Sequence, residues 1–213
     1  MKKLITAIAL LLAAVMLLTG CKSIDVQAKE LVEKNLKEVQ SGGFDEKNLK
    51  EITGGFANMG ISDESEETLK EAVNTIAKKM TYTVKSSKQD SDDKNLYIVS
   101  VELKTVDTDA IFMNKENWKE ILKIAFEQEA DGTIDEDGLQ KMIIDKWIGF
   151  ISEQSKTAKT DKTNVFEFEV TYDKDTKMIN TQLPYYVILG CSKDISDKLS
   201  DFIQEIAQEM VPE

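Results

Sequence analysis

The change of hydrophobic period at Met80 constrains the fold of this chain more than any other feature. Between Asp63 and Met80 the apolar residues recur every three or four positions, which is the spacing of one face of an α-helix. From Thr81 onward the period is two, and Tyr82 and Val84 alternate with polar neighbours as in a half-buried β-strand. A domain with both periods must pack an amphipathic helix against the apolar face of a sheet.

The same two periods divide the rest of the chain into helices and strands. Asp63, with Glu66 three residues later, is predicted to cap the helix before the first strand, and Asn114 and Asp135 are predicted to cap two inserted helices. The apolar run 185–189 predicts a further strand. The other predicted segments are helices 28–39, 44–52 and 63–80, strands 81–85 and 96–106, helices 114–130 and 135–153, strands 166–172 and 178–183, and a last helix 195–210.

This order predicts an α+β fold, with an antiparallel sheet that carries helices on one face and a helical pair inserted between its strands. The two pairs of strands are each joined by a short polar turn, as in hairpins. No internal repeat or low-complexity linker divides the chain. Residues 27–213 are therefore predicted to form a single domain with one core.

The first twenty residues have the composition of an export signal. Lys2 and Lys3 precede an apolar run from Leu4 to Leu18, which only Thr6 interrupts. A helix that crosses a bilayer needs about 20 apolar residues, so a run of 15 residues is short for a stable span. Because the positive end stays in the cytoplasm, we expect the remainder of the chain to be exported.

The apolar run ends in Leu18-Thr19-Gly20-Cys21, which resembles the lipobox of bacterial lipoprotein precursors. The resemblance implies that a signal peptidase recognises Leu18, Thr19 and Gly20 and that a diacylglyceryl group is attached to the Cys21 sulfur. Residues 1–20 would be the signal peptide, and 21–26 a lipidated tether. Each buried CH₂ contributes about 0.8 kcal/mol, so two acyl chains give stable attachment. The expected location is the extracytoplasmic face of the cell membrane; an ordinary signal or an uncleaved anchor with a chance cysteine is the alternative.

The domain after the tether resembles exported lipoproteins of low-GC Gram-positive bacteria that carry a cystatin-like or nuclear-transport-factor-like fold with a helical insertion. The resemblance rests on the strand 97–103, the helical pair 114–153 and the hairpin 166–183. Members often have a Trp in the second strand of that hairpin, where this chain has Met178-Ile179-Asn180. The resemblance implies a fold and a lipid anchor, and no activity.

The composition excludes several classes of function. The chain has no His, and all 27 of its basic residues are Lys, so it cannot use a Ser-His-Asp or Cys-His arrangement, an imidazole zinc ligand or a guanidinium group. The net charge is −12, and it becomes −14 once Lys2 and Lys3 leave with the signal. Phosphate backbones repel such a protein, so no nucleic-acid partner is expected. No catalytic motif, metal site or cofactor is predicted.

Five aromatic residues are the candidates for a ligand pocket between the sheet and the helices, in the manner of concave sites lined by apolar side chains. Burial in the core is the simpler interpretation of the same residues. The candidates are Trp118, Trp147, Phe166, Tyr185 and Tyr186.

Three other features have structural interpretations that outweigh functional ones. The segment 131–138 lacks the ligand spacing of a calcium-binding loop and reads as a helix stop followed by a cap. Glu167 and Glu169 are predicted to lie on the solvated face of a strand. Cys191 has no intramolecular partner if Cys21 is lipidated, and is predicted to be a small buried or half-buried residue.

The leading prediction of function is a non-catalytic domain that binds a protein, peptide or small ligand of the cell envelope. The alternative is an enzyme that uses carboxylate and Lys groups alone, which should show a deep pocket with buried carboxylates or a buried Lys. A minor alternative concerns the cleaved signal, because the apolar segment from Ala14 to Gly20 has the character of a short signalling peptide.

Overall fold

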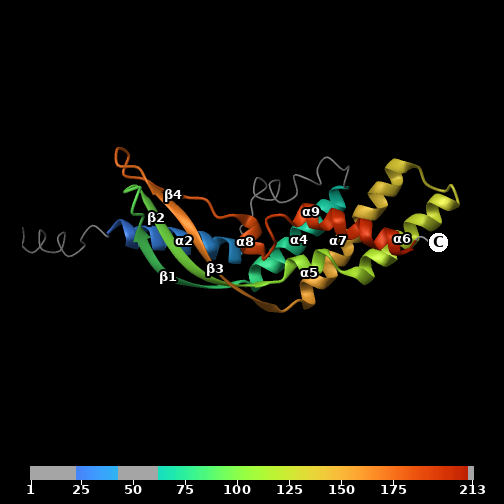
Figure 1. The fold of residues 1–213 in the computed structure, drawn as a ribbon, viewed down its shortest axis with the longest axis horizontal. Helices are drawn as coiled ribbons and strands as arrows, with labels where there is room; N and C mark the ends of the chain where they lie inside the picture. Colours follow the sequence, from blue (N-terminus) through green and yellow to red (C-terminus); the bar gives the residue numbers. More distant parts are fainter. Residues whose placement is uncertain (1–22, 43–61, 211–213) are drawn as a thin grey trace, which may run out of the picture.

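The computed structural model describes residues 23–42 and 62–210, apart from the side chains of Tyr185 and Ser196. The predictions for the export signal, Cys21 and the helix 44–52 lie outside the described residues. The elements, shown in Figure 1, are α2 (Ile24–Gln40), α4 (Asp63–Lys79), β1 (Thr81–Gln89), β2 (Leu96–Val106), α5 (Thr108–Phe112), α6 (Lys115–Ala130), α7 (Glu136–Thr157), β3 (Thr160–Tyr172), β4 (Ile179–Thr181), α8 (Tyr185–Leu189) and α9 (Ile195–Met210).

The four strands form one antiparallel sheet in the order β1-β2-β3-β4, and this confirms the predicted α+β class. The register places Val101 of β2 opposite Val84 of β1 and Phe166 of β3. Alternate residues of β2 are buried, as the period of two predicts. The buried residues at these alternating positions are Tyr97, Val99, Val101 and Leu103.

Helix α2 lies along the apolar face of the sheet (Figure 1). It buries Ala28, Val32 and Leu36 at the helical spacing that predicts it, although the helix begins at Ile24, inside the expected tether. Burial of a Val or Leu side chain contributes about 1.5–3 kcal/mol, so this stripe is a main attachment of α2 to the sheet. On β3, Glu167 and Glu169 are exposed, as predicted.

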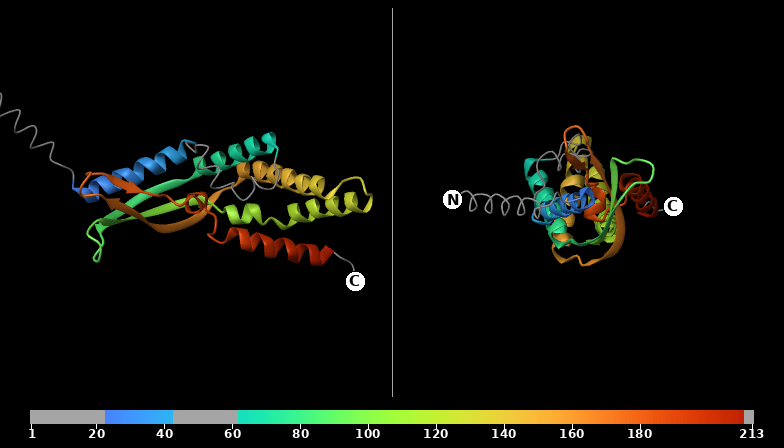
Figure 2. Two further views of the ribbon diagram at one scale, coloured as in Figure 1. Left: turned by 90° about the horizontal axis from the view of Figure 1, so that it is seen from above. Right: turned by 90° about the vertical axis from the view of Figure 1, so that its left-hand side faces the viewer.

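The other long helices extend beyond the end of the sheet, so that the molecule is elongated (Figure 2). Helix α4 packs along α7, α7 packs along α6, and α9 lies beside α6. The start of α2 lies at one end of the molecule, and the connection between α6 and α7 lies at the other (Figures 1 and 2). One cluster of buried apolar side chains continues through both parts, from Val32 in α2 to Ile206 in α9.

The predicted caps of the two inserted helices are confirmed. The side chain of Asn114 accepts a hydrogen bond from the backbone N–H of Asn117 at 3.1 Å. The side chain of Asp135 accepts one from the backbone N–H of Gly138 at 2.9 Å. The segment 131–138 is therefore a helix stop and a helix start, as its spacing predicts.

The predicted cap of α4 is wrong by one residue. Ser62 precedes the helix, and its hydroxyl accepts a hydrogen bond from the backbone N–H of Ser65 at 3.2 Å. Asp63 and Glu66 lie in the first turn, where a negative charge still interacts favourably with the helix dipole. A Ser immediately before Asp63 competes for the same role, and the pattern alone does not decide between them.

The prediction that residues 185–189 form a strand is wrong, because they form helix α8. It begins after Pro184 and ends at Gly190, whose φ of +75° is the left-handed conformation typical of a helix end. Val187, Ile188 and Leu189 are all buried, so the apolar run reflects burial of successive residues instead of strand alternation.

Helix α5 is a short element that the sequence pattern does not predict. It follows β2 directly, and Asp107 caps it by accepting a hydrogen bond from the backbone N–H of Ala110 at 3.4 Å. This turn of helix places Thr108 against the end of α8 and Asp109 against the segment between α8 and α9.

Candidate functional site

The structure brings two of the five aromatic candidates together and buries them. Trp118 of α6 and Trp147 of α7 are each 4% exposed, and their ring centroids are 6.0 Å apart. Both indole N–H groups donate to the carbonyl oxygen of Phe112, at 2.8 Å from Trp118 and 3.4 Å from Trp147. The two side chains therefore hold α5, α6 and α7 together as part of the core.

The other candidates lie on different elements. Phe166 is half-buried on β3 and packs against the core, and Tyr186 is exposed on α8. The side chain of Tyr185 lies outside the described residues, as do Leu18, Thr19, Gly20 and Cys21.

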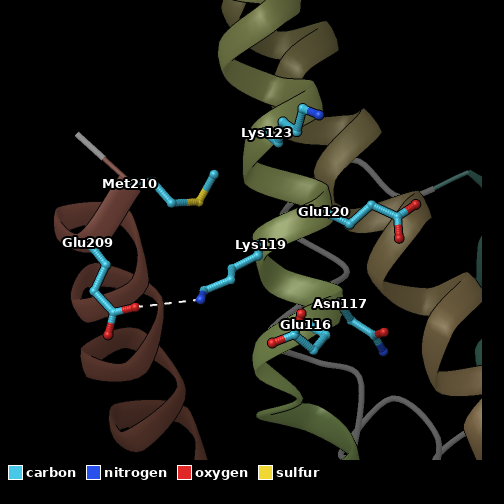
Figure 3. Close-up of a pocket in the computed structure, with 7 residues that line it drawn as sticks. All are labelled: Glu116, Asn117, Lys119, Glu120, Lys123, Glu209 and Met210. Carbon is cyan, nitrogen blue, oxygen red and sulfur yellow. Dashed lines mark ion pairs between the residues drawn. The ribbon is translucent and has the colours of Figure 1, made fainter. Parts of the chain in front are cut away.

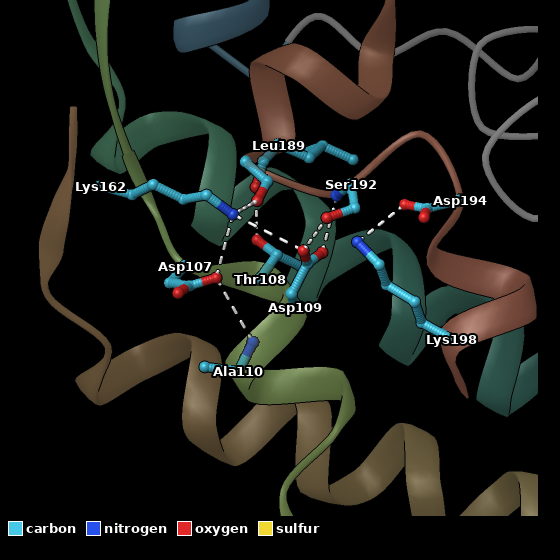
Figure 4. Close-up of polar contacts among 10 residues, drawn as sticks. Asp107, Thr108, Asp109, Ala110, Lys162, Leu189, Ser192, Asp194 and Lys198 are labelled. Carbon is cyan, nitrogen blue, oxygen red and sulfur yellow. Dashed lines mark hydrogen bonds and ion pairs between the residues drawn. The ribbon is translucent and has the colours of Figure 1, made fainter. Parts of the chain in front are cut away.

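A cluster of polar side chains, here called the polar junction, lies where the sheet meets the helices (Figure 4). It consists of Asp107, Asp109, Lys162 and Ser192. The amino group of Lys162, on β3, is 3.2 Å from the Asp107 carboxylate, 3.6 Å from that of Asp109 and 2.9 Å from the carbonyl oxygen of Gly190. Asp107 and Gly190 accept hydrogen bonds from this ammonium group, and Asp109 forms an ion pair with it.

Ser192 and Thr108 fix the segment between α8 and α9 to this cluster. The backbone N–H of Ser192 donates to Asp109 at 2.7 Å, and its hydroxyl donates to the other oxygen of the same carboxylate. The hydroxyl of Thr108 donates to the carbonyl oxygen of Leu189. The Asp109 side chain is 13% exposed, so it is the most enclosed carboxylate of the polar junction.

Sequence reasoning misses the polar junction because its members are far apart in the chain. Asp109 and Ser192 are separated by 83 residues, and Ser, Asp and Lys are too abundant for any pair to stand out. Gly190 offers the one usable signal, since a lone Gly after an apolar run often marks a close backbone approach. An added Cβ at Gly190 would lie 2.1 Å from the carbonyl oxygen of Val106.

Cys191 lies beside the polar junction and is half-buried, as predicted. Burial of the thiol, followed by the nearby charge of Asp109, raises the pKa of Cys191 to about 12. A thiol acts as a nucleophile or metal ligand in its thiolate form, so this cysteine is an inert one near neutral pH.

An open groove of about 510 Å³ lies between α6 and α9 and is here called the α6–α9 groove (Figure 3). Glu209 of α9 pairs across it with Lys115 at 2.7 Å and with Lys119 at 3.8 Å. The hydrogen bond from Lys115 lowers the pKa of Glu209, and the same bond raises the pKa of Lys115. The residues that line the groove are Glu116, Asn117, Lys119, Glu120, Lys123, Glu209 and Met210.

Charges of both signs along two helices suit a segment of another polypeptide better than an apolar small molecule. Small-molecule sites are mostly apolar and enclose their ligand, whereas this groove is open and has charged walls with a single thioether at its rim. The α6–α9 groove is therefore the candidate binding surface of the described chain.

A second, smaller hollow of about 260 Å³ lies between α4 and α7. Its lining includes Ser65, in the first turn of α4, whose hydroxyl donates to the carboxylate of Asp145 on α7. A carboxylate near the start of a helix interacts favourably with the helix dipole, so this contact is explained by the packing of α4 on α7.

Within 23–42 and 62–210, no three or more His, Cys, Asp and Glu side chains are grouped so that they could hold a metal ion. Among the helices described there, none has the length and apolar composition of a membrane span. Comparison of the chain with protein-family models, curated proteins and solved structures gave no match.

Proposed function

We propose that this chain is a bacterial lipoprotein whose domain is held on the extracytoplasmic face of the cell membrane by lipid on Cys21. The observation that carries the proposal is the position of the motif Leu18-Thr19-Gly20-Cys21. It ends an apolar run of 15 residues and lies three residues before α2 begins at Ile24. A thiol at this position would emerge at the membrane surface, with almost no chain between the lipid and the domain.

The proposal is tested by the intact mass of the protein isolated from bacterial membranes. We expect a chain that begins at Cys21 and carries the mass of a diacylglyceryl group. The Cys21→Ala variant should leave the membrane fraction or retain its leader, whereas the matched Cys191→Ala variant should remain membrane-bound. An unmodified Cys21 thiol, or an intact leader, would contradict the proposal.

We propose further that the domain is non-catalytic and binds a protein or peptide of the envelope through the α6–α9 groove. The support is the groove itself, with Lys119, Lys123 and Glu209 along two rigid helices. Charges on an interface increase the rate of association with a partner of complementary charge, so reversal of the Lys119 charge should weaken binding.

A photo-crosslinking experiment on the anchored protein tests this surface. A crosslinking residue at Asn117, inside the groove, should give a discrete adduct that a second substitution, Lys119→Glu, removes. Lys141→Glu, an exposed change on α7 outside the groove, is the matched control and should leave the adduct unchanged. Equal loss with both variants, or no adduct in living cells, would count against the groove.

The polar junction supports a second candidate function, an enzyme that uses Asp109, Lys162 and Ser192. In favour of it, Asp109 is largely enclosed and touches both other groups. A screen of ester, peptide and glycoside substrates tests it, with Ser192→Ala as the control. Turnover that Ser192→Ala abolishes while the fold is retained would favour the enzyme over the binding domain.

A further inference from the structure

The two ends of this elongated molecule differ in what they expose. The start of α2, the turn between β1 and β2 and the turn between β3 and β4 lie together at the sheet end (Figures 1 and 2). The connection between α6 and α7 lies at the opposite, helical end. Any anchor joined to α2 through a short tether must therefore lie near the sheet end.

The charge of the protein is distributed unevenly between these ends. The helical tip, residues 127–137, has six acidic residues and no Lys. At the sheet end, the turn 88–94 has three Asp and two Lys, and the turn 173–177 has two Asp and two Lys, which leaves a net charge of −1 for both turns together. An anionic lipid surface repels the tip far more strongly than it repels the two turns.

The two turns at the sheet end are fixed in shape by the same device. The carboxylate of Asp90 accepts hydrogen bonds from two backbone N–H groups of its own turn, at 2.9 and 3.0 Å. The carboxylate of Asp173 does the same in the other turn, at 2.8 and 3.1 Å. The backbone N–H of Asp173 also donates to the carbonyl oxygen of Met178 at 2.8 Å, so the position of Met178 is set by the turn.

Two of the large apolar side chains that the described chain exposes lie at this end. Met178, just after the turn, is 57% exposed, and Val26, in the first turn of α2, is 40% exposed. Single exposed apolar residues are common on soluble proteins. These two are distinctive in their position, because both lie next to the place where the chain leaves toward Cys21.

We propose that the sheet end rests on the lipid surface, with Met178 and Val26 at the contact and the helical end directed away from the membrane. The inference rests on the proposed lipid anchor at Cys21, which is three residues from Ile24 and so no more than about 11 Å away along the chain. Helix α7 alone, with its 22 residues, is about 33 Å long. Charges at the helical tip are thus several Debye lengths of about 8 Å from the surface.

The orientation is tested with the full-length lipidated protein on vesicles of phosphatidylcholine and phosphatidylglycerol that contain a lipid with a nitroxide on its headgroup. The native Trp118 and Trp147 are buried where α5, α6 and α7 meet and serve as an internal control, so wild-type emission should not be quenched. A Met178→Trp variant should lose most of its added emission on these vesicles. The matched Gln140→Trp variant, exposed on α7 near the tip, should lose none.

Each outcome of the experiment separates the orientation from the anchor. If the variants float with the vesicles and neither added Trp is quenched, or both are quenched equally, the orientation is wrong and the anchor stands. If wild-type protein does not float, the proposed lipid anchor fails. Should Met178→Trp not fold, Val26→Trp gives the same readout at the same end.

Discussion

The sheet end and the helical end of this molecule are stabilised by different kinds of contact. In the sheet, β2 pairs with β1 and β3 over most of its length, so a backbone ladder holds the strands and the register gives each residue its partner. At the helical end, single side chains make the decisive contacts, as when Trp118 and Trp147 share one carbonyl acceptor. We therefore expect a large loss of stability where a substitution removes a contact that no other group can replace. We expect a small loss where many backbone hydrogen bonds share the stabilisation, or where the side chain is exposed to solvent.

The largest expected loss of stability follows from substitution of Trp118, which donates to the carbonyl oxygen of Phe112. Trp118→Ala removes a buried indole and its 2.8 Å hydrogen bond, and should lower the free energy of unfolding by about 3–5 kcal/mol. The matched change on the same helix, Phe126→Ala, removes a side chain that is 39% exposed and should cost less than about 1 kcal/mol. Urea unfolding measures the free energy of unfolding of both variants. Similar losses would contradict the difference in burial between Trp118 and Phe126.

The close approach at Gly190 should give the next largest effect. In Gly190→Ala the new Cβ meets the Val106 carbonyl oxygen at 2.1 Å and φ is +75°, so we expect a loss of about 3 kcal/mol. Gly132→Ala is the control, since its φ is +60° but nothing lies within 4 Å of the new Cβ; it should cost only about 1–2 kcal/mol. Thermal unfolding of the two variants separates the steric contact from the backbone strain.

A third comparison sets the polar junction against an ion pair on the solvated face of the sheet. Lys162→Met leaves Asp107 and Asp109 without their cation and should cost about 1–2 kcal/mol, because Lys162 is only 29% exposed. Lys85→Met breaks the pair with Glu102 at 3.0 Å, where both side chains are at least 40% exposed, and should cost less than about 1 kcal/mol. High salt should reduce the loss in unfolding free energy of Lys85→Met more than that of Lys162→Met. An equal reduction would show that the polar junction is as exposed to solvent as the surface pair.

The effect that is smallest near neutral pH concerns Cys191, because it develops only as pH rises above 9. The folded-state pKa is raised from 9.0 to about 12, so the unfolded chain loses its thiol proton first as pH rises. Titration of the thiol should therefore leave stability independent of pH below pH 9, and should lower it progressively between pH 9 and 12. The measurement is the difference in unfolding free energy between the wild type and Cys191→Ala across that range, and a difference that stays constant would contradict the raised pKa. Alkylation of the native thiol near neutral pH should accordingly be slow.

Periodicity predicted most of the fold because most elements are half-buried. The alternation in β2 and the stripe in α2 each mark one buried and one solvated face, and both predictions are confirmed. Helix α8 lacks such a contrast, since Val187, Ile188 and Leu189 are all buried, and a run of five apolar residues has no period to read. There the flanking Pro184 and Gly190 were better indicators than the run itself.

The candidate sites were harder to predict than the fold. The aromatic residues are natural candidates because large side chains line many pockets. Trp118 and Trp147, however, are buried and pack in the core. The α6–α9 groove lies between two helices far apart in the chain, and the polar junction is formed by three chain segments that converge only after folding. The residues of neither site recur at a regular spacing, so no sequence motif indicates them.

The contact between Gly190 and the last carbonyl of β2 also limits how this chain can diverge. Any side chain there would have to displace a strand end whose other partners are fixed, so compensation would require several simultaneous changes. In a library randomised at this position and selected for folding, we expect glycine alone to survive. The bend between α8 and α9 should therefore accept few substitutions, whereas exposed acidic residues of the helical tip that cap no helix, such as Glu129 and Asp137, should accept many.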